Sequence, residues 1–222
     1  MALFLIERGA DVNSSDSDNW TPLLNSAKNG NAELVRVLIE KRAMIDARDS
    51  GNFTSLMWAC YKNRTDCVKL LLDANANPNV QCKNSICCLS WAAGRGHLEV
   101  VEQLLQANNI KVNAQDQSSS TPLLWAARKG SLGIVKALIK KDADPNLAGM
   151  LAMTPLIASC KFAHIEVALF LIELPQVNLN HIDKDGNTAL QISAKSGHPA
   201  IVLSLLEKGA YINTPNLKAC FF

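Results

Sequence analysis

The sequence of 222 residues has no long apolar run, little net charge and few aromatic residues, and these shortages exclude several classes of protein. No uninterrupted apolar stretch reaches the ~18–20 residues of a membrane-spanning helix. The formal net charge is +2 and the pI is 8.1, below the ~9 that is usual for dedicated nucleic-acid-binding domains. Apolar residues make up 48% and charged residues 19% of the chain, a composition that excludes a disordered protein.

Motifs of catalysis and metal binding are also missing. The seven cysteines are odd in number and unevenly spaced, so we interpret them as reduced thiols of a cytoplasmic protein. Cys82, Cys87 and Cys88 cluster, but they lack the paired C-x-x-C spacing of a zinc site and have no histidine nearby in the sequence. No P-loop, zinc-protease or serine-hydrolase motif occurs. We therefore expect no metal, no cofactor and no enzymatic activity.

The most informative feature of the sequence is a repeat. A motif related to Thr-Pro-Leu recurs every 33 or 34 residues, and pairs of leucine or isoleucine recur at the same interval from Leu5-Ile6 to Leu205-Leu206. The repeat motif begins, in order, at Thr21, Thr54, Cys87, Thr121, Thr154 and Thr188.

Each period predicts two short helices and a loop. A Thr-Pro pair is typical of a helix N-cap followed by the first helical residue. The first helix is expected to end at a residue suited to a left-handed C-cap, such as Gly30, Asn63 or Gly130. A second helix is expected to follow, as in 97–106, where the apolar residues fall on one face of a helical wheel. The polar link after it, as in 183–187, favours a tight hairpin turn.

A helix pair and a hairpin loop every ~33 residues resemble the ankyrin-repeat family. The resemblance implies an all-α solenoid of stacked helix-turn-helix units with β-hairpin-like loops. Residues 1–15 are then predicted to be a partial N-terminal repeat, 16–215 six ankyrin repeats, and 216–222 a truncated C-terminal tail. The histidine that usually follows Thr-Pro-Leu in this family is replaced in all six repeats, by Leu24, Met57, Ser90, Leu124, Ile157 and Gln191.

The histidines that are present do not form a metal site. His97, His164 and His198 share one position of the repeat, which we interpret as the first residue of a second helix. Equivalent positions are spaced along a solenoid, so the three cannot converge on one ion. His181 falls in a loop.

Three blocks go beyond the general ankyrin pattern. W-A-C-Y-K at 58–62, W-A-A-G-R-G-H at 91–97 and W-A-A-R-K-G at 125–130 are similar to the ankyrin region of the kinase-D-interacting, ankyrin-repeat-rich membrane-spanning scaffold family. This resemblance implies the cytoplasmic platform of a receptor-signalling scaffold. Its implied partners are receptor tails, kinases or small-GTPase regulators, and any membrane location belongs to the full-length family.

Aromatic residues indicate a binding surface. Trp58, Trp91 and Trp125 occupy equivalent positions of three successive first helices and are predicted to form a ladder. Trp20 and Phe53 each precede a repeat Thr and are predicted to lie on hairpin tips. Either these side chains simply fill an apolar position of the fold, or they are anchors on a concave binding face.

Every repeat also carries a cation seven or eight residues after its start. Such a cation stabilises a helix C-terminus, and it could equally belong to a basic stripe that binds an acidic or phosphorylated segment. We predict a monomeric, non-catalytic protein-binding module, the alternative being a binder of nucleic acid or anionic lipid. The predicted protein-binding residues are Trp20, Phe53, Trp58, Tyr61, Lys62, Trp91, Arg95, Trp125, Arg128, Lys129, Lys161 and Phe162.

Overall fold

The computed structural model describes residues 2–215, and in this range the regular secondary structure consists of thirteen α-helices and one 3-10 turn, joined by loops. The only extended pairings in this range are two isolated β-bridges, Gln81 with Cys87 and Ile182 with Thr188. The all-α fold expected from the sequence is therefore confirmed. The chain divides into two compact units, residues 1–114 (unit 1) and 115–222 (unit 2).

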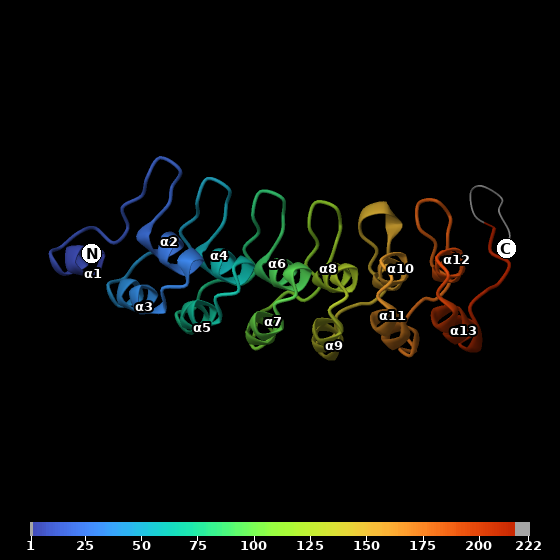
Figure 1. Ribbon diagram of the computed structural model, residues 1–222. Helices are drawn as coiled ribbons and strands as arrows, with labels where there is room; N and C mark the ends of the chain where they lie inside the picture. The colour runs from blue at the N-terminus through green and yellow to red at the C-terminus, as the bar shows by residue number, and fades with distance from the viewer. Residues whose placement is uncertain (1, 216–222) are drawn as a thin grey trace. The chain divides into compact units, whose positions relative to one another are not determined.

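Unit 1 consists of one single helix followed by three helix pairs. The first helices of the pairs, α2, α4 and α6, pack side by side, and the second helices, α3, α5 and α7, form a parallel layer (Figure 1). The helices are α1 (Ala2–Glu7), α2 (Pro22–Asn29), α3 (Ala32–Glu40), α4 (Ser55–Tyr61), α5 (Thr65–Asp73), α6 (Cys88–Arg95) and α7 (Leu98–Leu104).

Unit 2 repeats this arrangement with three further pairs. Its first helices α8, α10 and α12 pack in sequence, and α11 packs between α9 and α13 in the second layer. The helices are α8 (Pro122–Lys129), α9 (Leu132–Lys140), α10 (Pro155–Lys161), α11 (Ile165–Ile172), α12 (Ala189–Lys195) and α13 (Pro199–Glu207), with the 3-10 turn η1 (Met150–Ala152) before α10.

The repeat motif forms the helix starts that its chemistry predicts. In five of the six first helices the threonine hydroxyl accepts the backbone N–H of the residue three positions later, for example Thr21 from Leu24 at 3.3 Å. The sixth, α6, begins at Cys87, whose side chain makes no cap hydrogen bond. Gly30, Gly96 and Gly130 end three of the helices in the left-handed conformation, with φ of 81°, 83° and 78°.

The positions where the family usually has histidine belong to the core. Leu24, Met57 and Leu124 are completely buried, so apolar packing replaces the hydrogen bond of a histidine in these repeats. Gln191 instead keeps a hydrogen bond of this kind, since its Nε2 donates to the carbonyl oxygen of Thr214, in the segment after α13, at 2.6 Å. It also closes a capping box, in which its Oε1 accepts the backbone N–H of Thr188 at 3.0 Å.

Asparagine side chains connect the loops of neighbouring repeats within each unit. In unit 1, Asn79 accepts the backbone N–H of Lys111 and donates to the carbonyl of Asn109, both at 2.8 Å. In unit 2, Asn146 accepts from the backbone of Asn178 at 2.7 Å and donates to the carbonyl of Gln176 at 2.7 Å. These bonds hold each loop at a fixed register against the next.

Three of the histidines lie one residue before the helical position that the sequence predicts for them. His97, His164 and His198 are the N-cap residues of α7, α11 and α13, rather than their first helical residues. Nε2 of His164 donates to the carbonyl oxygen of Arg128 at 2.9 Å, and Nε2 of His181 donates to that of Ala152 at 3.0 Å. These two histidines therefore tie neighbouring segments together.

Helix α1 (Ala2–Glu7) lies within residues 1–15, the range that we predict to be a partial N-terminal repeat. The predicted tail, 216–222, falls outside the described residues.

Candidate protein-interaction surface

Five aromatic side chains of unit 1 form one continuous group, the aromatic cluster: Trp20, Phe53, Trp58, Tyr61 and Trp91. Trp58 is at its centre, with ring centroids 5.1 Å from Trp20, 4.8 Å from Phe53 and 5.8 Å from Tyr61. Trp91 lies 5.8 Å from Phe53 and 5.0 Å from Tyr61, so these two rings join it to Trp58. All five side chains are half-buried, and the pairs have the tilted or edge-to-face geometry that aromatic rings prefer.

Trp20 and Phe53 are not on the hairpin tips, in contrast to the prediction. The turn of the first loop is closed by the backbone N–H of Asn19, which donates to the carbonyl of Asp16 at 3.0 Å, and Trp20 follows this turn. Phe53 has the equivalent place after the turn that begins at Asp49. Both residues immediately precede the threonine cap of a first helix, and from this position their rings contact the ring of Trp58.

A buried aspartate orients the indole of Trp58. Oδ2 of Asp49 accepts the Trp58 Nε1–H at 2.8 Å, while its Oδ1 accepts the backbone N–H groups of Gly51 and Phe53 in the loop. In unit 2, Asp116 accepts from Trp125 Nε1 at 3.0 Å in the same way. Sequence reasoning missed both aspartates, although an Asp nine positions before a Trp in both repeats was a signal that could have revealed them.

Trp91 lacks this partner. Cys82 stands nine positions before it, where the other two repeats have aspartate. The indole Nε1 of Trp91 is buried and has no hydrogen-bond partner among the described residues. An unpaired buried donor is costly, so Trp91 is held less well than Trp58 although both belong to the same cluster.

Three cations of unit 1 lie on the aromatic cluster. Nζ of Lys28 is 4.4 Å from the ring centre of Trp20 and 4.8 Å from that of Trp58. Cζ of Arg95 is 3.9 Å and Nζ of Lys62 is 5.2 Å from the ring centre of Tyr61. These are cation–π distances. Of the three, Lys28 was not among the predicted binding residues.

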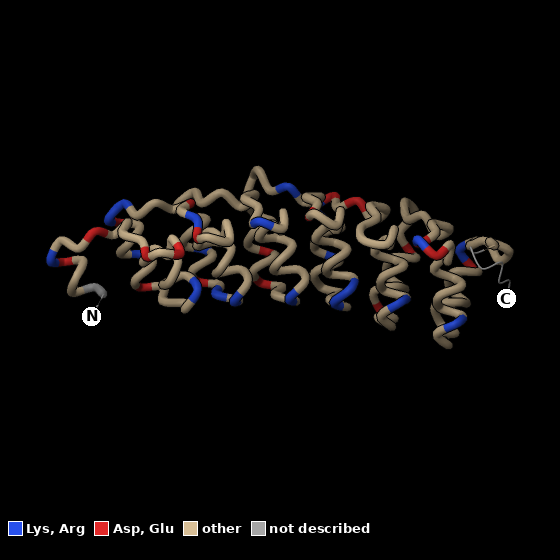
Figure 2. Tube along the Cα trace, turned by 90° about the horizontal axis from the view of Figure 1, so that it is seen from above, with Lys and Arg blue, Asp and Glu red and all other residues tan. Residues whose placement is uncertain are grey.

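Lys28, Lys62 and Arg95 form no ion pairs within the described residues, and one carboxylate, that of Asp49, is bonded to Trp58 of the cluster. Helices α2, α4 and α6 contain no aspartate or glutamate. Across residues 2–215, no carboxylate forms an ion pair with Lys28, Lys62 or Arg95. Figure 2 shows lysine and arginine gathered toward one end of the helices in each unit. Unit 1 therefore combines an aromatic surface with three cations that form no ion pair.

The remaining predicted residues form a smaller group in unit 2. Cζ of Arg128 lies 5.3 Å from the ring centre of Trp125 and 5.4 Å from that of Phe162, whose side chain is 42% exposed. Lys129 and Lys161 are exposed at the ends of α8 and α10. The predicted ladder of three tryptophans is thus divided between the units, and within unit 1 its members Trp58 and Trp91 are joined through other rings.

The cysteines have the character of core residues. All six in the described part of the chain are buried and unpaired. Burial raises the pKa of the Cys160 thiol to about 11 and also raises the pKa of Cys87. The pKa of Cys88 is raised well above its ordinary value. The main cause is a side-chain hydrogen bond with Cys60, and the second is burial. A thiol with a raised pKa is a poor nucleophile and a poor metal ligand.

In the part of the chain that the structure covers, no three or more histidine, cysteine, aspartate or glutamate side chains are placed to hold a metal ion. None of the described helices has the length and apolar character that crossing a bilayer requires.

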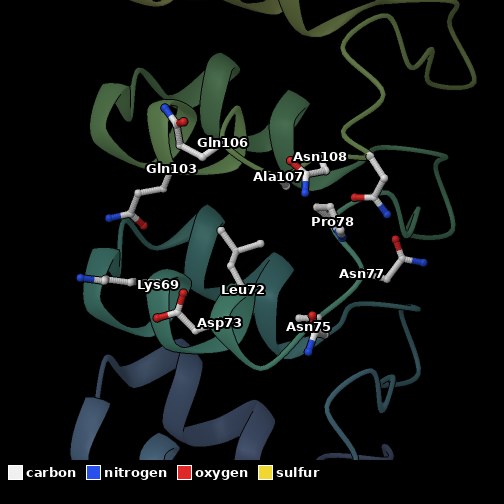
Figure 3. Close-up of a pocket in the computed structure, with 12 residues that line it drawn as sticks. Lys69, Leu72, Asp73, Asn75, Asn77, Pro78, Gln103, Gln106, Ala107 and Asn108 are labelled. Atoms are coloured by element: carbon white, nitrogen blue, oxygen red, sulfur yellow. The ribbon is translucent and has the colours of Figure 1, made fainter.

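A pocket of unit 1 lies away from the predicted residues. It has a volume of about 990 Å³ and lies between α5, α7 and the loops that follow them (Figure 3). Amide side chains dominate its lining, among them Asn75, Asn77, Gln103 and Gln106, and Lys69 and Asp73 also line it. None of the residues of the aromatic cluster contributes to it.

Comparisons with known proteins agree on the architecture. The family pattern described as "Ankyrin repeats (3 copies)" matches residues 1–82, 74–149 and 147–216. The crystal structure of the human ASB11 ankyrin repeat domain superposes with a TM-score of 0.80 at 21% sequence identity, covering 91% of this chain and 90% of that one. A search of curated protein sequences gives no significant match.

These matches cover nearly the whole chain and fit the helix pairs, threonine caps and asparagine-linked loops described above. Ankyrin repeats generally mediate protein–protein interactions and are typically not catalytic. The chain belongs to the ankyrin-repeat family.

Proposed function

We propose that this protein is a non-catalytic interaction module and that the aromatic cluster of unit 1 is its main binding surface. The observation that carries the proposal is the set of five half-buried rings with three cations on them and no carboxylate paired to those cations. Tryptophan, tyrosine and arginine are the residues that most often dominate binding energy at protein interfaces.

The rings can contribute binding energy without large rearrangement. Trp58 is fixed by its bond to Asp49, and its contacts with four other groups restrict the neighbouring side chains. A surface that is already ordered loses little conformational entropy when a partner binds. The smaller group around Arg128 in unit 2 has the same chemistry and would extend recognition to a longer partner.

The finer proposal concerns the biological setting. The W-A-C-Y-K, W-A-A-G-R-G-H and W-A-A-R-K-G blocks contain Trp58, Tyr61, Lys62, Trp91, Arg95, Trp125, Arg128 and Lys129, that is, most of the residues found in the two groups. Their similarity to the kinase-D-interacting scaffold family supports a role as the cytoplasmic platform of a receptor-signalling scaffold. Receptor tails, kinases and small-GTPase regulators are the corresponding partners.

Affinity capture from cell extract tests the binding surface. We expect Trp91→Ala combined with Arg95→Ala to remove most of the captured protein, because the pair takes away an anchor ring and the cation nearest Tyr61. Circular dichroism checks that the variant keeps its helical content. Should Trp91→Ala impair folding, Arg95→Glu alone changes the same surface at an exposed side chain.

A matched control comes from the second-helix layer of unit 2. Nζ of Lys136 lies 5.6 Å from the ring centre of Phe170, so Phe170→Ala with Lys136→Ala also removes one ring and one cation. This control is expected to capture as the unaltered chain does. Equal capture by all the variants would refute the assignment of the surface. Capture of nucleic acid or anionic vesicles in place of protein would favour the alternative function.

A further inference from the structure

We propose that Cys82 is a site of oxidative modification, at which hydrogen peroxide converts the thiol to a sulfinate that accepts the unpaired N–H of Trp91. The modification is independent of the proposed function, because it is a covalent change in the hairpin loop of residues 82–86 and not the binding of a partner. Three features support it: the place of Cys82 in the loop, the unpaired indole, and the chemistry of the oxidised side chain.

Cys82 has the same place in its hairpin loop as Asp49 has in the preceding repeat. The backbone N–H of Cys82 donates to the carbonyl oxygen of Ile86 at 3.1 Å, and its carbonyl oxygen accepts the N–H of Ser85 at 2.8 Å. The loop of Asp49 has the same two bonds, with the residues at the same two positions, at 3.0 and 2.9 Å. The side chain of Cys82 therefore starts from the same point of the loop as the side chain of Asp49.

The indole of Trp91 is a donor without an acceptor. In the preceding repeat, Oδ2 of Asp49 accepts the Trp58 Nε1–H at 2.8 Å. In unit 2, Asp116 accepts the Nε1–H of Trp125 at 3.0 Å. Nε1 of Trp91 is buried and has no hydrogen-bond partner in the described part of the chain. Because a thiol is only a weak acceptor, this site lacks the oxygen that the two equivalent sites have.

A cysteine sulfinate has the connectivity of aspartate, because the atom that follows Cβ bears two oxygens and a negative charge. One oxygen can accept the Trp91 N–H, as the aspartate oxygen does in the preceding repeat. The other can accept the backbone N–H groups of Asn84 and Ile86, which are two and four residues after Cys82. These are the positions from which Oδ1 of Asp49 accepts its two backbone N–H groups. Oxidation therefore supplies the missing acceptor.

Hydrogen peroxide reaches Cys82 more readily than the other cysteines of the described residues. Cys82 is 6% exposed, whereas Cys87 is 3% exposed and the other four are 0% exposed. Lys83 and Asn84 beside it are exposed, so a small opening of the hairpin admits the oxidant. Burial raises the pKa of Cys160 to about 11 and also raises the pKa of Cys87, and this lowers the thiolate fraction of both.

The conversion consumes two molecules of hydrogen peroxide. In each step the sulfur attacks one peroxide oxygen, and an S–O bond forms as the O–O bond breaks. The hydroxide that leaves takes up the proton released from the sulfur group and becomes water. The first step oxidises the thiolate to a sulfenic acid and the second oxidises the sulfenic acid to a sulfinic acid, which ionises to the sulfinate; the sulfur gives up two electrons in each step.

Peptide mapping tests the selectivity on the full chain. The chain is treated with hydrogen peroxide and then with a reductant, which reverses sulfenic acids and disulfides but not sulfinates. We expect Cys82 to gain two oxygens at least about tenfold faster than Cys160, as measured by mass spectrometry of the two peptides. Cys82→Ala, treated alongside, is the matched control, since it undergoes every other oxidation.

The folded state reports whether the sulfinate meets Trp91. We expect the treatment to raise the midpoint of urea unfolding by about 0.5 M in the unaltered chain, because a buried donor gains its acceptor. Treated Cys82→Ala is expected to lack this rise. The indole N–H proton resonance of Trp91, identified by its loss in Trp91→Phe, is expected to move downfield as the hydrogen bond forms.

Both measurements can overturn the inference. Cys82 recovered as a thiol, or oxidised no faster than Cys160, overturns it. It is also overturned if treatment changes the midpoint equally in the unaltered chain and in Cys82→Ala, or if the Trp91 resonance stays in place. Capture by the Trp91→Ala, Arg95→Ala variant is a separate measurement, so none of these outcomes bears on the proposed function.

Discussion

Among the residues of the aromatic cluster, Trp91 differs from Trp58 by the lack of one hydrogen bond. Asp49 accepts the indole N–H of Trp58, whereas the equivalent N–H of Trp91 is buried and unpaired because Cys82 replaces the aspartate. The cost of a buried unpaired donor is about 1–3 kcal/mol. The folded chain is therefore less stable than it would be if the Trp91 indole had a hydrogen-bond partner, and Trp91 is a residue that we place in the binding surface.

Restoring the aspartate is expected to stabilise the chain. Cys82→Asp should raise the free energy of unfolding by about 1–2 kcal/mol, because the new carboxylate can accept both the Trp91 indole and the loop N–H groups, as Asp49 does. Urea denaturation followed by circular dichroism measures the change.

The matched control for this prediction is Cys82→Asn. An asparagine oxygen can accept the loop N–H groups, but its amide nitrogen cannot accept the indole N–H. The excess stability of the aspartate variant over the asparagine variant therefore measures the indole bond. If the two variants are equally stable, or if the gain persists when Trp91 is changed to Phe, the explanation is wrong.

The buried thiol of Cys160 makes stability depend on pH in the alkaline range. Its pKa is raised from 9.0 to about 11 by burial, so above pH 9 the unfolded chain loses this proton and the folded chain keeps it. Stability is therefore complete below pH 9 and falls as the pH rises toward 11. At pH 10.5 we expect a loss of about 2 kcal/mol relative to pH 8 from this residue.

Comparison with Cys160→Ala isolates this effect from the titration of lysines, which is common to both chains. Urea denaturation in the presence of a reductant at pH 8 and at pH 10.5 gives the loss for each chain. The variant is expected to lose less stability than the unaltered chain between these two values. A loss of the same size in both would show that this thiol does not contribute.

At the scale of helices, α6 lacks the cap that the other first helices share. The threonine hydroxyl caps α2, α4, α8, α10 and α12, whereas Cys87 makes no such bond. The backbone of Cys87 nevertheless has the extended conformation of the threonine caps, with φ −94° and ψ 172°. The backbone at position 87 therefore has the conformation that a threonine cap requires, although the residue there is cysteine.

A reciprocal exchange tests the contribution of this cap. We expect Cys87→Thr to raise the free energy of unfolding by about 1 kcal/mol and Thr121→Cys, at the same position of α8, to lower it by about 1 kcal/mol. Chemical denaturation of both variants measures the change. Two changes of the same sign would contradict the assignment.

The sequence predicts those parts of the fold that are determined by residues within a single repeat. The caps, the left-handed helix ends and the amphipathic second helices depend on residues within one repeat, so the helix pairs follow from the motif. The surface depends on contacts between repeats. Lys28 lies seven residues after Thr21, so the sequence indicates that a cation is present in this repeat. The placement of its ammonium over the rings of Trp20 and Trp58 depends on side-chain conformations, which the pattern of a single repeat does not determine.

For the molecule as a whole, stability is expected to vary along the chain, because each repeat of a solenoid is stabilised by its neighbours. Helix α1 has six residues, and the side chains of Phe4 and Leu5 are 51% and 50% exposed. Leu56, Met57 and Cys60 of α4, by contrast, are completely buried between neighbouring helices. The division into two units was not predicted, because the repeat motif at Thr121 continues without any change of residue type there.

Amide hydrogen exchange measures this gradient. We expect the amides of α1 to exchange at least about a hundredfold faster than those of α4, since local opening of α1 exposes little additional apolar surface. Mass spectrometry of peptides from the two helices gives both rates in one sample. Equal protection of α1 and α4 would show that the chain opens only as a whole.

The central claim of this account is that a protein partner covers the aromatic cluster of unit 1. Hydroxyl-radical footprinting of the captured complex tests it most directly, by comparing oxidation rates with those of the free chain. We expect the rates at Trp20, Phe53 and Trp91 to fall severalfold on binding, while Met44, which is 57% exposed and outside the cluster, keeps its rate. Protection of Met44 with unchanged oxidation of the three aromatic residues would contradict the claim.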